Sequence, residues 1–339
     1  MRNHEVTERH PLLNSAGELA EPGWSRHLLQ EYDRSTIKAP KWRIKEWDYY
    51  LVLNREFAGA FTISDDGYIG LQSVSLLTFG DVPREHTETV LNAFPLGRMK
   101  LPSDSSKGTT KYADKRLNME FSVSDQKRRI LCRFENFWNG KPFECDITLE
   151  QPQMESMVIA TPWDQKHAFY YNQKINTMRA DGYMKYDGKV YRFDPRTDFG
   201  TLDWGRGVWT YDNTWLWGSG NADLHGRRFG FNIGYGFGNT SAATENVLFY
   251  EGKVHKLDDV TFHIPENIMD KWTFSSSDGR FETEFVPVLD RSACIDLKVI
   301  LSNQHQVFGK MTGKAELDDG QVIEFRDMMC FAEKVHNRY

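Results

Sequence analysis

The sequence predicts an all-β protein, and three observations support that prediction. Aromatic residues make up 14% of the chain, as 22 Phe, 10 Trp and 14 Tyr, and such side chains favour pleated, half-buried surfaces. Several segments alternate apolar and polar residues, as a strand with one buried face does. Asp-Gly and Asn-Gly dipeptides recur between these segments. Strand periodicity broken by tight-turn dipeptides indicates antiparallel hairpins.

The first forty residues predict an irregular arm that packs onto the body, because Pro and Gly interrupt any periodicity there. The rest of the 339-residue chain is long enough for two β domains of about 150 residues each. We place a boundary after the FYYNQK segment (169–174). This gives an arm over 1–40, a first β domain over 41–180 and a second over 181–339.

Strands with one buried face are predicted at 117–123, 143–149 and 295–301, where the period is two. Tight turns are predicted at six dipeptides, namely Asp66-Gly67, Asn139-Gly140, Asp181-Gly182, Asp187-Gly188, Asp278-Gly279 and Asp319-Gly320. Candidate helices are confined to short stretches, such as 24–33 and 84–93.

Net charge and processing signals exclude several partners. The chain has a formal charge of −6, so we expect neither a nucleic-acid partner nor attraction to anionic membranes. No secretory signal and no span of roughly 18 apolar residues is visible, which predicts a cytoplasmic protein without stable membrane insertion. The four cysteines form no CxxC pair and are predicted to be reduced core residues, namely Cys132, Cys145, Cys294 and Cys330.

Residues 199–217 concentrate tryptophan beside charge, with four Trp within fourteen positions next to Asp203 and Arg206. These two charged residues are close enough in sequence to pair across a turn. One interpretation is a buried ion pair that pins a barrel corner. The other makes Asp203 a general acid whose pKa is set by apolar surroundings and by Arg206.

Residues 229–238 predict a strand with an aromatic face and a glycine face. The aromatic face holds Phe229, Phe231, Ile233, Tyr235 and Phe237. The opposite face holds Gly230, Asn232, Gly234, Gly236 and Gly238. A glycine face leaves room for something bulky. That neighbour is either a ligand on bare backbone or another protein layer.

Other candidates have structural alternatives. Glu245 and Asn246 either cap a loop or contact a ligand. A strand is predicted to carry Tyr171, Asn172 and Lys174. Their side chains either contact a ligand or lie on the surface or against a neighbouring strand. His225 is a candidate catalytic residue in a predicted turn. The histidines show neither HxH nor HxxxH, and GxSxG and GxGxxG are absent, so the sequence indicates no metal, serine nucleophile or dinucleotide cofactor.

Longer blocks of sequence resemble one bacterial family, catalogued as domain of unknown function 2804. The blocks are EWDYYLV (46–52), TISDDGYIGL (62–71), FYYNQK (169–174), LDWGRGVW (202–209), GYGFGNTSAATENVLFYEGKVHKL (234–257) and HQVFGKMTG (305–313). The chain is more distantly similar to the lipocalin-like families that contain carotenoid hydratases and tocopherol cyclases. That similarity rests on the order of Gly182 to Lys189, Asp203-Trp204-Gly205 and Trp215-Leu216-Trp217, and it is broken by Arg206 after Gly205. It implies two lipocalin-like antiparallel β-barrels and an apolar ligand in a barrel or inter-barrel cavity.

We therefore expect binding, and cofactor-independent conversion, of a small hydrophobic molecule of isoprenoid, lipid or aromatic type. The conversion would be hydration, cyclisation or lyase/isomerase chemistry. The candidate catalytic residues are Asp203, Arg206 and His225. The candidate ligand contacts are Tyr171, Asn172, Lys174, Trp204, Trp209, Tyr211, Trp215, Trp217, Asn232, Gly234, Tyr235, Gly236, Glu245 and Asn246. A non-catalytic carrier and a carbohydrate-binding or carbohydrate-hydrolysing protein are the alternatives.

Overall fold

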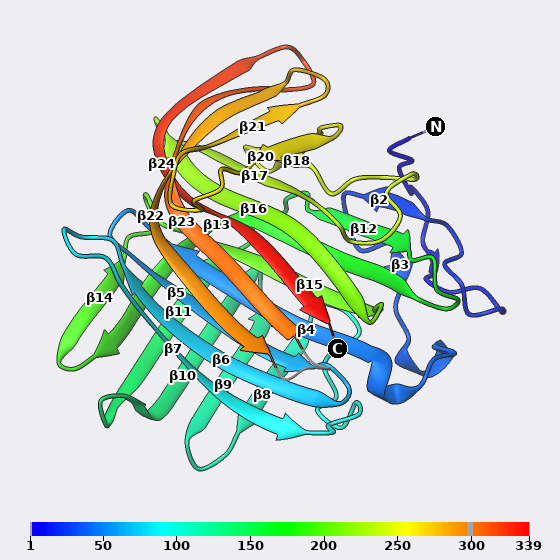
Figure 1. Ribbon diagram of the computed structural model, residues 1–339, viewed down its shortest axis with the longest axis horizontal. Helices are drawn as coiled ribbons and strands as arrows, with labels where there is room; N and C mark the ends of the chain where they lie inside the picture. Colours follow the sequence, from blue (N-terminus) through cyan, green and yellow to red (C-terminus); the bar gives the residue numbers. More distant parts are fainter. Residues whose placement is uncertain (1, 297–300, 339) are drawn as a thin grey trace.

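The computed structural model describes residues 2–296 and 301–338. They form two large antiparallel sheets, each curled into a half-barrel, with their convex sides packed together (Figure 1). This confirms the predicted all-β class with two barrel-like sheets. Helical turns among the described residues are limited to the 3-10 segments η1 (Arg34–Thr36) and η2 (Lys41–Arg43).

The first sheet follows the arm and takes up residues 44–208. Its ten successive neighbours are β7 (Arg84–Ala93), β6 (Ile69–Thr78), β5 (Phe57–Asp65), β4 (Ile44–Leu53), β15 (Phe199–Val208), β13 (Phe169–Tyr186), β11 (Lys141–Glu150), β10 (Lys127–Trp138), β9 (Leu117–Ser124) and β8 (Gly108–Ala113). Three short strands attach beside them, namely β12 (Met157–Pro162), β14 (Lys189–Phe193) and, from the arm, β2 (Gly23–Ser25). The other arm strands, β1 (His10–Pro11) and β3 (Gln30–Glu31), pair with each other in parallel.

The second sheet takes up residues from 212 onward. Its order is β19 (Lys253–Lys256), β18 (Val247–Tyr250), β17 (Arg227–Tyr235), β16 (Asp212–Leu224), β24 (Val322–Arg338), β23 (Leu301–Glu316), β22 (Phe281–Asp296), β21 (Trp272–Ser276) and β20 (Val260–His263). Every pairing within this sheet is antiparallel among the described residues.

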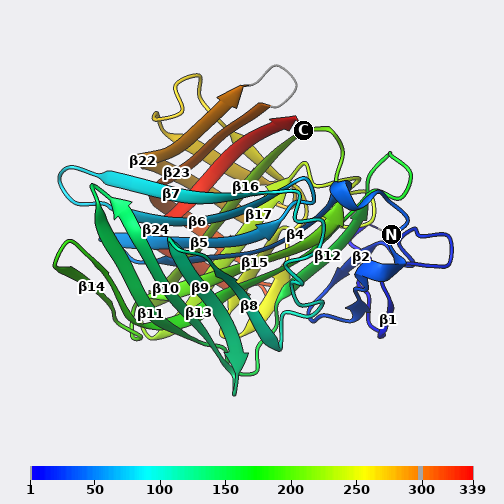
Figure 2. The same ribbon diagram turned by 90° about the horizontal axis from the view of Figure 1, so that it is seen from below.

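The first sheet curls until distant strands meet, as the view from below shows (Figure 2). The His86 ring of β7 stacks on the Trp138 ring of β10, with 4.8 Å between ring centres. In the second sheet, Tyr235 of β17 packs edge-on against Phe262 of β20, with ring centres 5.7 Å apart. Since these strands are far apart in the sheet order, each contact shows strong curvature.

The chain passes from the first sheet to the second between Val208 and Asp212. Residue 180, where the sequence placed the domain boundary, lies inside β13, which pairs with β11 and β15 of the first sheet. The two sheets therefore divide later in the chain than the predicted domains do.

Most predicted strands and turns are confirmed. The segments 117–123 and 143–149 lie within β9 and β11. Five of the turn dipeptides join adjacent strands, but Asp181-Gly182 lies within β13, where a Cβ on Gly182 would come within 2.1 Å of the Asp146 carbonyl oxygen. Close approach to the neighbouring strand, rather than a turn, requires this glycine.

Three predicted segments have other outcomes. The segment 84–93 is strand β7 and not a helix, because its whole length pairs with β6. The segment 24–33 contains most of β2 and all of β3 instead of a helix. The strand predicted at 295–301 includes residues 297–300, which lie outside the described residues; Asp296 ends β22 and Leu301 begins β23.

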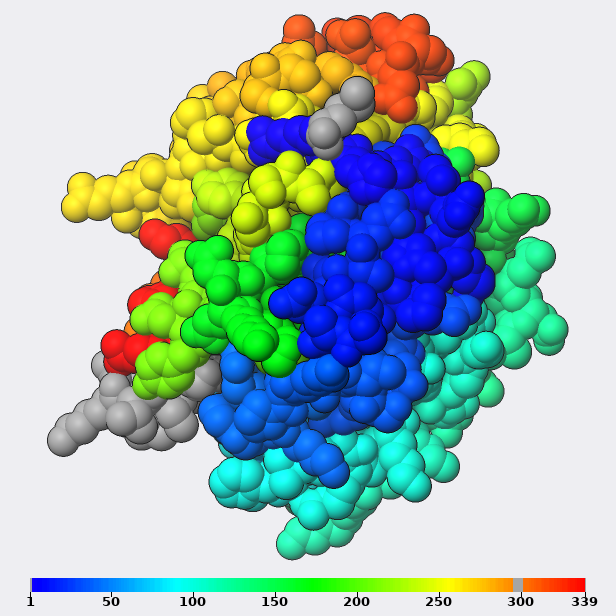
Figure 3. Space-filling view, turned by 90° about the vertical axis from the view of Figure 1, so that its right-hand side faces the viewer, coloured from blue at the N-terminus to red at the C-terminus, as the bar shows by residue number. Residues whose placement is uncertain are grey.

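The arm lies across the junction of the two sheets (Figure 3). Trp24 of β2 pairs with Ile159 of β12 in the first sheet. Near the start of the chain, the side-chain oxygen of Asn3 accepts a hydrogen bond of 3.1 Å from the backbone of Thr244, in the second half of the chain. The predicted arm thus contacts both halves of the chain.

Apolar side chains form three cores, one inside each curled sheet and one between the sheets. The predicted core position holds for Cys132, Cys145 and Cys330, whereas Cys294 is exposed. None of the four cysteines forms a disulfide. Residues 2–296 and 301–338 contain no helix that could cross a lipid bilayer.

Candidate functional site

Strand β15 directs its side chains to two different places. Successive residues of a strand point to opposite faces. Trp204 therefore lies in the core inside the first sheet, whereas Asp203 faces the second sheet. Arg206 shares the face of Trp204 and pairs with Asp48 across the sheet, with 3.0 Å between Nη2 and Oδ1. The predicted pair of Asp203 and Arg206 does not form, because residues three apart in a strand point in opposite directions.

Asp203 is held by three donors from the first sheet. Its Oδ1 lies 2.8 Å from the Lys174 ammonium and accepts a hydrogen bond of 2.6 Å from Asn172. Its Oδ2 accepts one of 3.1 Å from the Trp47 indole. Lys174 and Asn172 leave the same face of β13, two residues apart. The carboxylate is therefore fixed in place by an ammonium and two neutral donors.

Two further carboxylates, from the part of the chain that forms the second sheet, lie near Asp203. Glu333 of β24 accepts hydrogen bonds from the Trp215 indole (2.9 Å) and the Gln306 amide (3.0 Å). Glu245, in the loop after β17, accepts one of 3.3 Å from the Tyr170 hydroxyl of the first sheet. We call Asn172, Lys174, Asp203, Glu245 and Glu333 the inter-sheet cluster.

Burial sets the electrostatics of the inter-sheet cluster. It raises the pKa of Glu333 to about 7, although the Trp215 hydrogen bond and the Lys174 charge oppose the rise. It also raises the pKa of Glu245, again against Lys174. Lys174 therefore faces three carboxylates, and Glu333 titrates where an acid–base catalyst works best.

Aromatic rings surround these charges. The Lys174 ammonium lies 3.9 Å from the centre of the Trp217 ring. The Trp209 ring stands edge-on to Trp47 (5.5 Å between centres) and to Trp215 (5.3 Å). Phe237 stacks on Tyr170 with ring centres 4.9 Å apart. The walls of the cluster are thus π faces, which attract positive charge.

The glycine face of β17 packs against protein. A Cβ on Gly230 would lie 2.9 Å from the Thr177 side chain of the first sheet. A Cβ on Gly234 would lie 2.5 Å from Glu245 Oε1 and 2.7 Å from the Leu216 carbonyl oxygen. Gly234 therefore makes room for the Glu245 carboxylate, so of the two explanations for this face, the structure shows the protein neighbour.

Strand β17 also ends earlier than predicted. Gly236 and Gly238 adopt φ values of +96° and +82°, which turn the chain away from the sheet. Phe237 consequently lies in the core between the sheets and not beside Phe229 and Phe231.

Of the seventeen predicted site residues, the structure gathers seven between the sheets. Asn172, Lys174, Asp203, Glu245 and the indoles of Trp209, Trp215 and Trp217 meet there. Two further predicted residues make hydrogen bonds within the part of the chain that forms the second sheet. The side-chain oxygen of Asn232 accepts one of 2.7 Å from the Trp217 indole. That of Asn246 accepts one of 2.7 Å from the Gly234 backbone N–H.

Other predicted site residues lie elsewhere. Tyr171, Trp204 and Arg206 point into the first sheet, where the Tyr171 hydroxyl donates to the Gln30 carbonyl oxygen at 2.6 Å. His225 is exposed in the turn after β16, at the end of that strand far from Trp215. Tyr211 and Tyr235 are exposed, and Gly236 packs on the backbone of Thr214 and Trp215.

Sequence reasoning missed Trp47, Tyr49, Tyr170, Gln306 and Glu333. Trp47 and Tyr49 lie within EWDYYLV, and Tyr170 lies within FYYNQK. The period of two places Tyr170 on the same face of β13 as Asn172 and Lys174. Glu333 shares a face with Phe331 and Val335 of β24. A carboxylate at an apolar position of a strand is the signal that identifies it.

Candidate metal ligands do not gather: the part of the chain that the structure describes holds no group of three His, Cys, Asp or Glu side chains suited to a metal ion.

Comparison with known proteins places the chain in a family. The match covers residues 3–339 and is to the domain of unknown function DUF2804. The chain belongs to this family. Curated protein sequences include none that is significantly similar to it.

Solved structures that are similar to this chain include the following two. A candidate AttH protein from Nitrosomonas europaea has a TM-score of 0.51 at 13% identity, covering 90% of this chain and 96% of its own. Kievitone hydratase from Nectria haematococca has a TM-score of 0.46 at 10% identity, covering 98% of each chain. The first similarity extends the two-sheet fold to another protein.

Proposed function

We propose that the inter-sheet cluster binds a small hydrophobic molecule of isoprenoid, lipid or aromatic type and transfers protons to and from it without a cofactor. The observation that supports this most strongly is the pKa of Glu333, raised to about 7 by burial. A general acid with a pKa near the working pH is both protonated often enough and acidic enough to donate.

Each charged residue of the cluster takes a role that follows from its contacts. Glu333 gives its proton to a carbon of a substrate double bond, and the carbon beside it becomes cationic. The face of the Tyr170 ring, which Phe237 uncovers when it leaves, attracts such a cation. Either water adds to the cation and gives a proton to Glu245, which is hydration, or an adjacent carbon gives its proton to Glu245, which is isomerisation. Proton exchange with solvent then restores the acid form of Glu333 and the carboxylate of Glu245.

Asp203 has a different role in this proposal from the one the sequence suggested. Its two oxygens accept from Lys174, Asn172 and Trp47. Hydrogen bonds to a carboxylate stabilise its charged form. Asp203 therefore orients Lys174 and stabilises positive charge, while Glu333 donates the proton.

Access to the cluster involves the loop that follows β17. Phe237 covers Tyr170 and is flanked by Gly236 and Gly238. Binding requires Phe237 to leave the Tyr170 ring. The near-complete burial of Lys174 and Asp203, with side chains 2% and 11% exposed, argues against stacked sugars, which need an open groove.

Native mass spectrometry of the protein purified from its own host tests the binding part. We expect a co-purified apolar molecule that is lost in Trp209→Leu, at the wall of the cluster. The control Trp42→Leu, at an exposed indole, keeps it. A molecule that both variants retain, or none in any preparation, contradicts the proposed site.

A further inference from the structure

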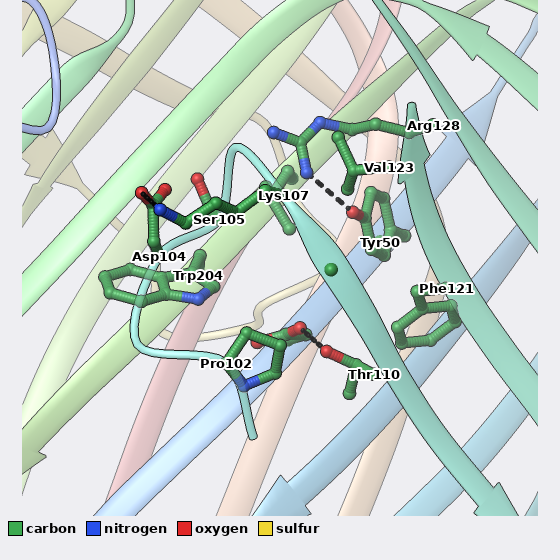
Figure 4. A pocket seen from close by; sticks show the side chains of 13 residues that line it. Tyr50, Pro102, Asp104, Ser105, Lys107, Thr110, Phe121, Val123, Arg128 and Trp204 are labelled. Carbon is green, nitrogen blue, oxygen red and sulfur yellow. Dashed lines mark hydrogen bonds and ion pairs between the residues drawn. The ribbon is translucent and has the colours of Figure 1, made fainter. Parts of the chain in front are cut away.

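A pocket separate from the inter-sheet cluster lies inside the first sheet, on the opposite face of β15 from Asp203 (Figure 4). It is a cavity of about 10 Å³, close to the room that one water molecule needs. Trp204, Tyr50 and Arg128 line it, and the segment from Pro102 to Gly108 passes over it.

Arg128 is a charged residue at an inward, apolar position. It lies two residues before Ile130 on the same face of β10, and only 2% of it is exposed. Its Nε donates to the Gln151 amide oxygen (2.6 Å) and its Nη1 to the Tyr50 hydroxyl (3.1 Å). Both acceptors are neutral. No carboxylate of residues 2–296 and 301–338 forms an ion pair with Arg128.

The carboxylates near this pocket are already paired. Asp48 accepts from Arg206 (3.0 Å) and from Thr110 (2.5 Å). Asp104 lies 3.6 Å from the Lys107 ammonium and accepts two hydrogen bonds from Ser106. Asp48 and Asp104 therefore balance the charges of Arg206 and Lys107. Among the described residues near this pocket, the positive charge of Arg128 has no carboxylate to balance it.

Two buried donors face this region without an acceptor. Arg128 Nη2 and Trp204 Nε1 are fully buried, and neither has a hydrogen-bond partner among the described residues. A buried guanidinium without a countercharge destabilises the fold because its charge is taken out of water without compensation. A water molecule would satisfy its hydrogen bond but not its charge.

We propose that this pocket binds a small monovalent anion such as chloride, held by Arg128. An anion larger than a water molecule requires a small outward shift of the segment 102–108, and a bulky oxyanion requires a larger one. The bound anion gives the interior of the first sheet its missing countercharge and stabilises the fold there. This site is independent of the inter-sheet cluster, since Asp203 and Trp204 leave opposite faces of β15.

Thermal unfolding at constant ionic strength tests the proposal, with chloride exchanged for gluconate, which is too large for the pocket. We expect the melting temperature to be higher in 300 mM chloride than in gluconate, by about 1–3 °C if chloride binds in the millimolar range. Arg128→Met should abolish this difference and Arg128→Lys should keep it. The matched control is Arg129→Met, because Arg129 is the next residue of β10, points outward and pairs with Asp146 at 2.7 Å.

Crystals of the unaltered protein grown in sodium bromide provide a measurement that needs no variant. An anomalous bromide peak within hydrogen-bonding distance of Arg128 Nη2 is the expected result. A water molecule at that position, equal melting temperatures in chloride and gluconate, or a chloride effect that persists in Arg128→Met would each overturn the proposal.

Discussion

The ammonium of Lys174, in the first sheet, lies 3.9 Å from the centre of the Trp217 ring, in the second sheet. Trp217 is the register partner of Glu333, so this contact brings the positive charge of one sheet to the carboxylate of the other. The same ammonium is 2.8 Å from Asp203. Lys174 therefore joins the two sheets and lies at the centre of the proposed site.

Comparing Asp203→Asn with Asp48→Asn tests whether Asp203 contributes to conversion of the bound molecule as well as to stability. Asp203→Asn leaves Lys174 without its nearest countercharge, so we expect the free energy of unfolding to fall by about 3–5 kcal/mol and conversion of the bound molecule to fall about 10²-fold because Lys174 is misplaced. Asp48→Asn breaks the pair with Arg206 on the other face and should reduce stability alone. Equal loss of conversion in both variants would contradict a special role for Asp203.

The raised pKa of Glu333 predicts how stability depends on pH. Between the ordinary pKa of 4.5 and about 7, the folded protein keeps a proton that the unfolded chain has released. The contribution of Glu333 to the free energy of unfolding therefore falls as pH rises through this window and is constant outside it.

Glu333→Gln lacks this titration. The melting temperature of the variant relative to the unaltered protein should rise steadily from pH 4.5 to pH 7 and then level off. Scanning calorimetry of both proteins at several pH values measures the difference. A difference that stays constant with pH would show that Glu333 does not titrate in this range.

The glycine face of β17 gives a packing prediction. Gly234→Ala places a methyl group 2.5 Å from Glu245 Oε1 and 2.7 Å from a backbone carbonyl oxygen that cannot move away easily. We expect a loss of about 1–3 kcal/mol in the free energy of unfolding, measured by denaturant titration. Gly80→Ala is the control, because its Cβ would meet nothing within 4 Å. If Gly234→Ala were as stable as Gly80→Ala, the close approach of Glu245 would be wrong.

Local patterns in the sequence predicted the class of fold and many of its strands. The alternation of apolar and polar residues predicted β9 and β11, and five dipeptides predicted hairpin turns. These predictions were right because one-sided strands and tight turns depend on residues that are neighbours in sequence. The segment 84–93 was misassigned because its pairing with β6 overrides local preference. The turn predicted at Asp181-Gly182 was wrong, because Gly182 lies within β13 and leaves room for the backbone of the neighbouring strand.

The candidate site was predicted in part for a related reason. Asp203 and Lys174 are 29 positions apart in sequence but adjacent in register across β13 and β15. Glu333 and Gln306 meet them only because the two sheets pack together. Adjacency in sequence suggested Arg206 as the partner of Asp203, whereas the alternation of strand faces directs the two side chains apart. Long-range pairing, which a single sequence does not display, decides the composition of the site.

Solvent deuterium is the most direct test of proton transfer by the inter-sheet cluster. The molecule that co-purifies with the protein would be extracted and incubated with fresh protein in D2O, and carbon-bound deuterium would be measured by mass spectrometry. Because the Glu333 proton exchanges with solvent, the proposal predicts incorporation of at least one deuterium on carbon. The signal should be lost in Glu333→Gln and retained in Asp48→Asn. Binding without any deuterium on carbon would contradict catalysis and leave the protein a carrier.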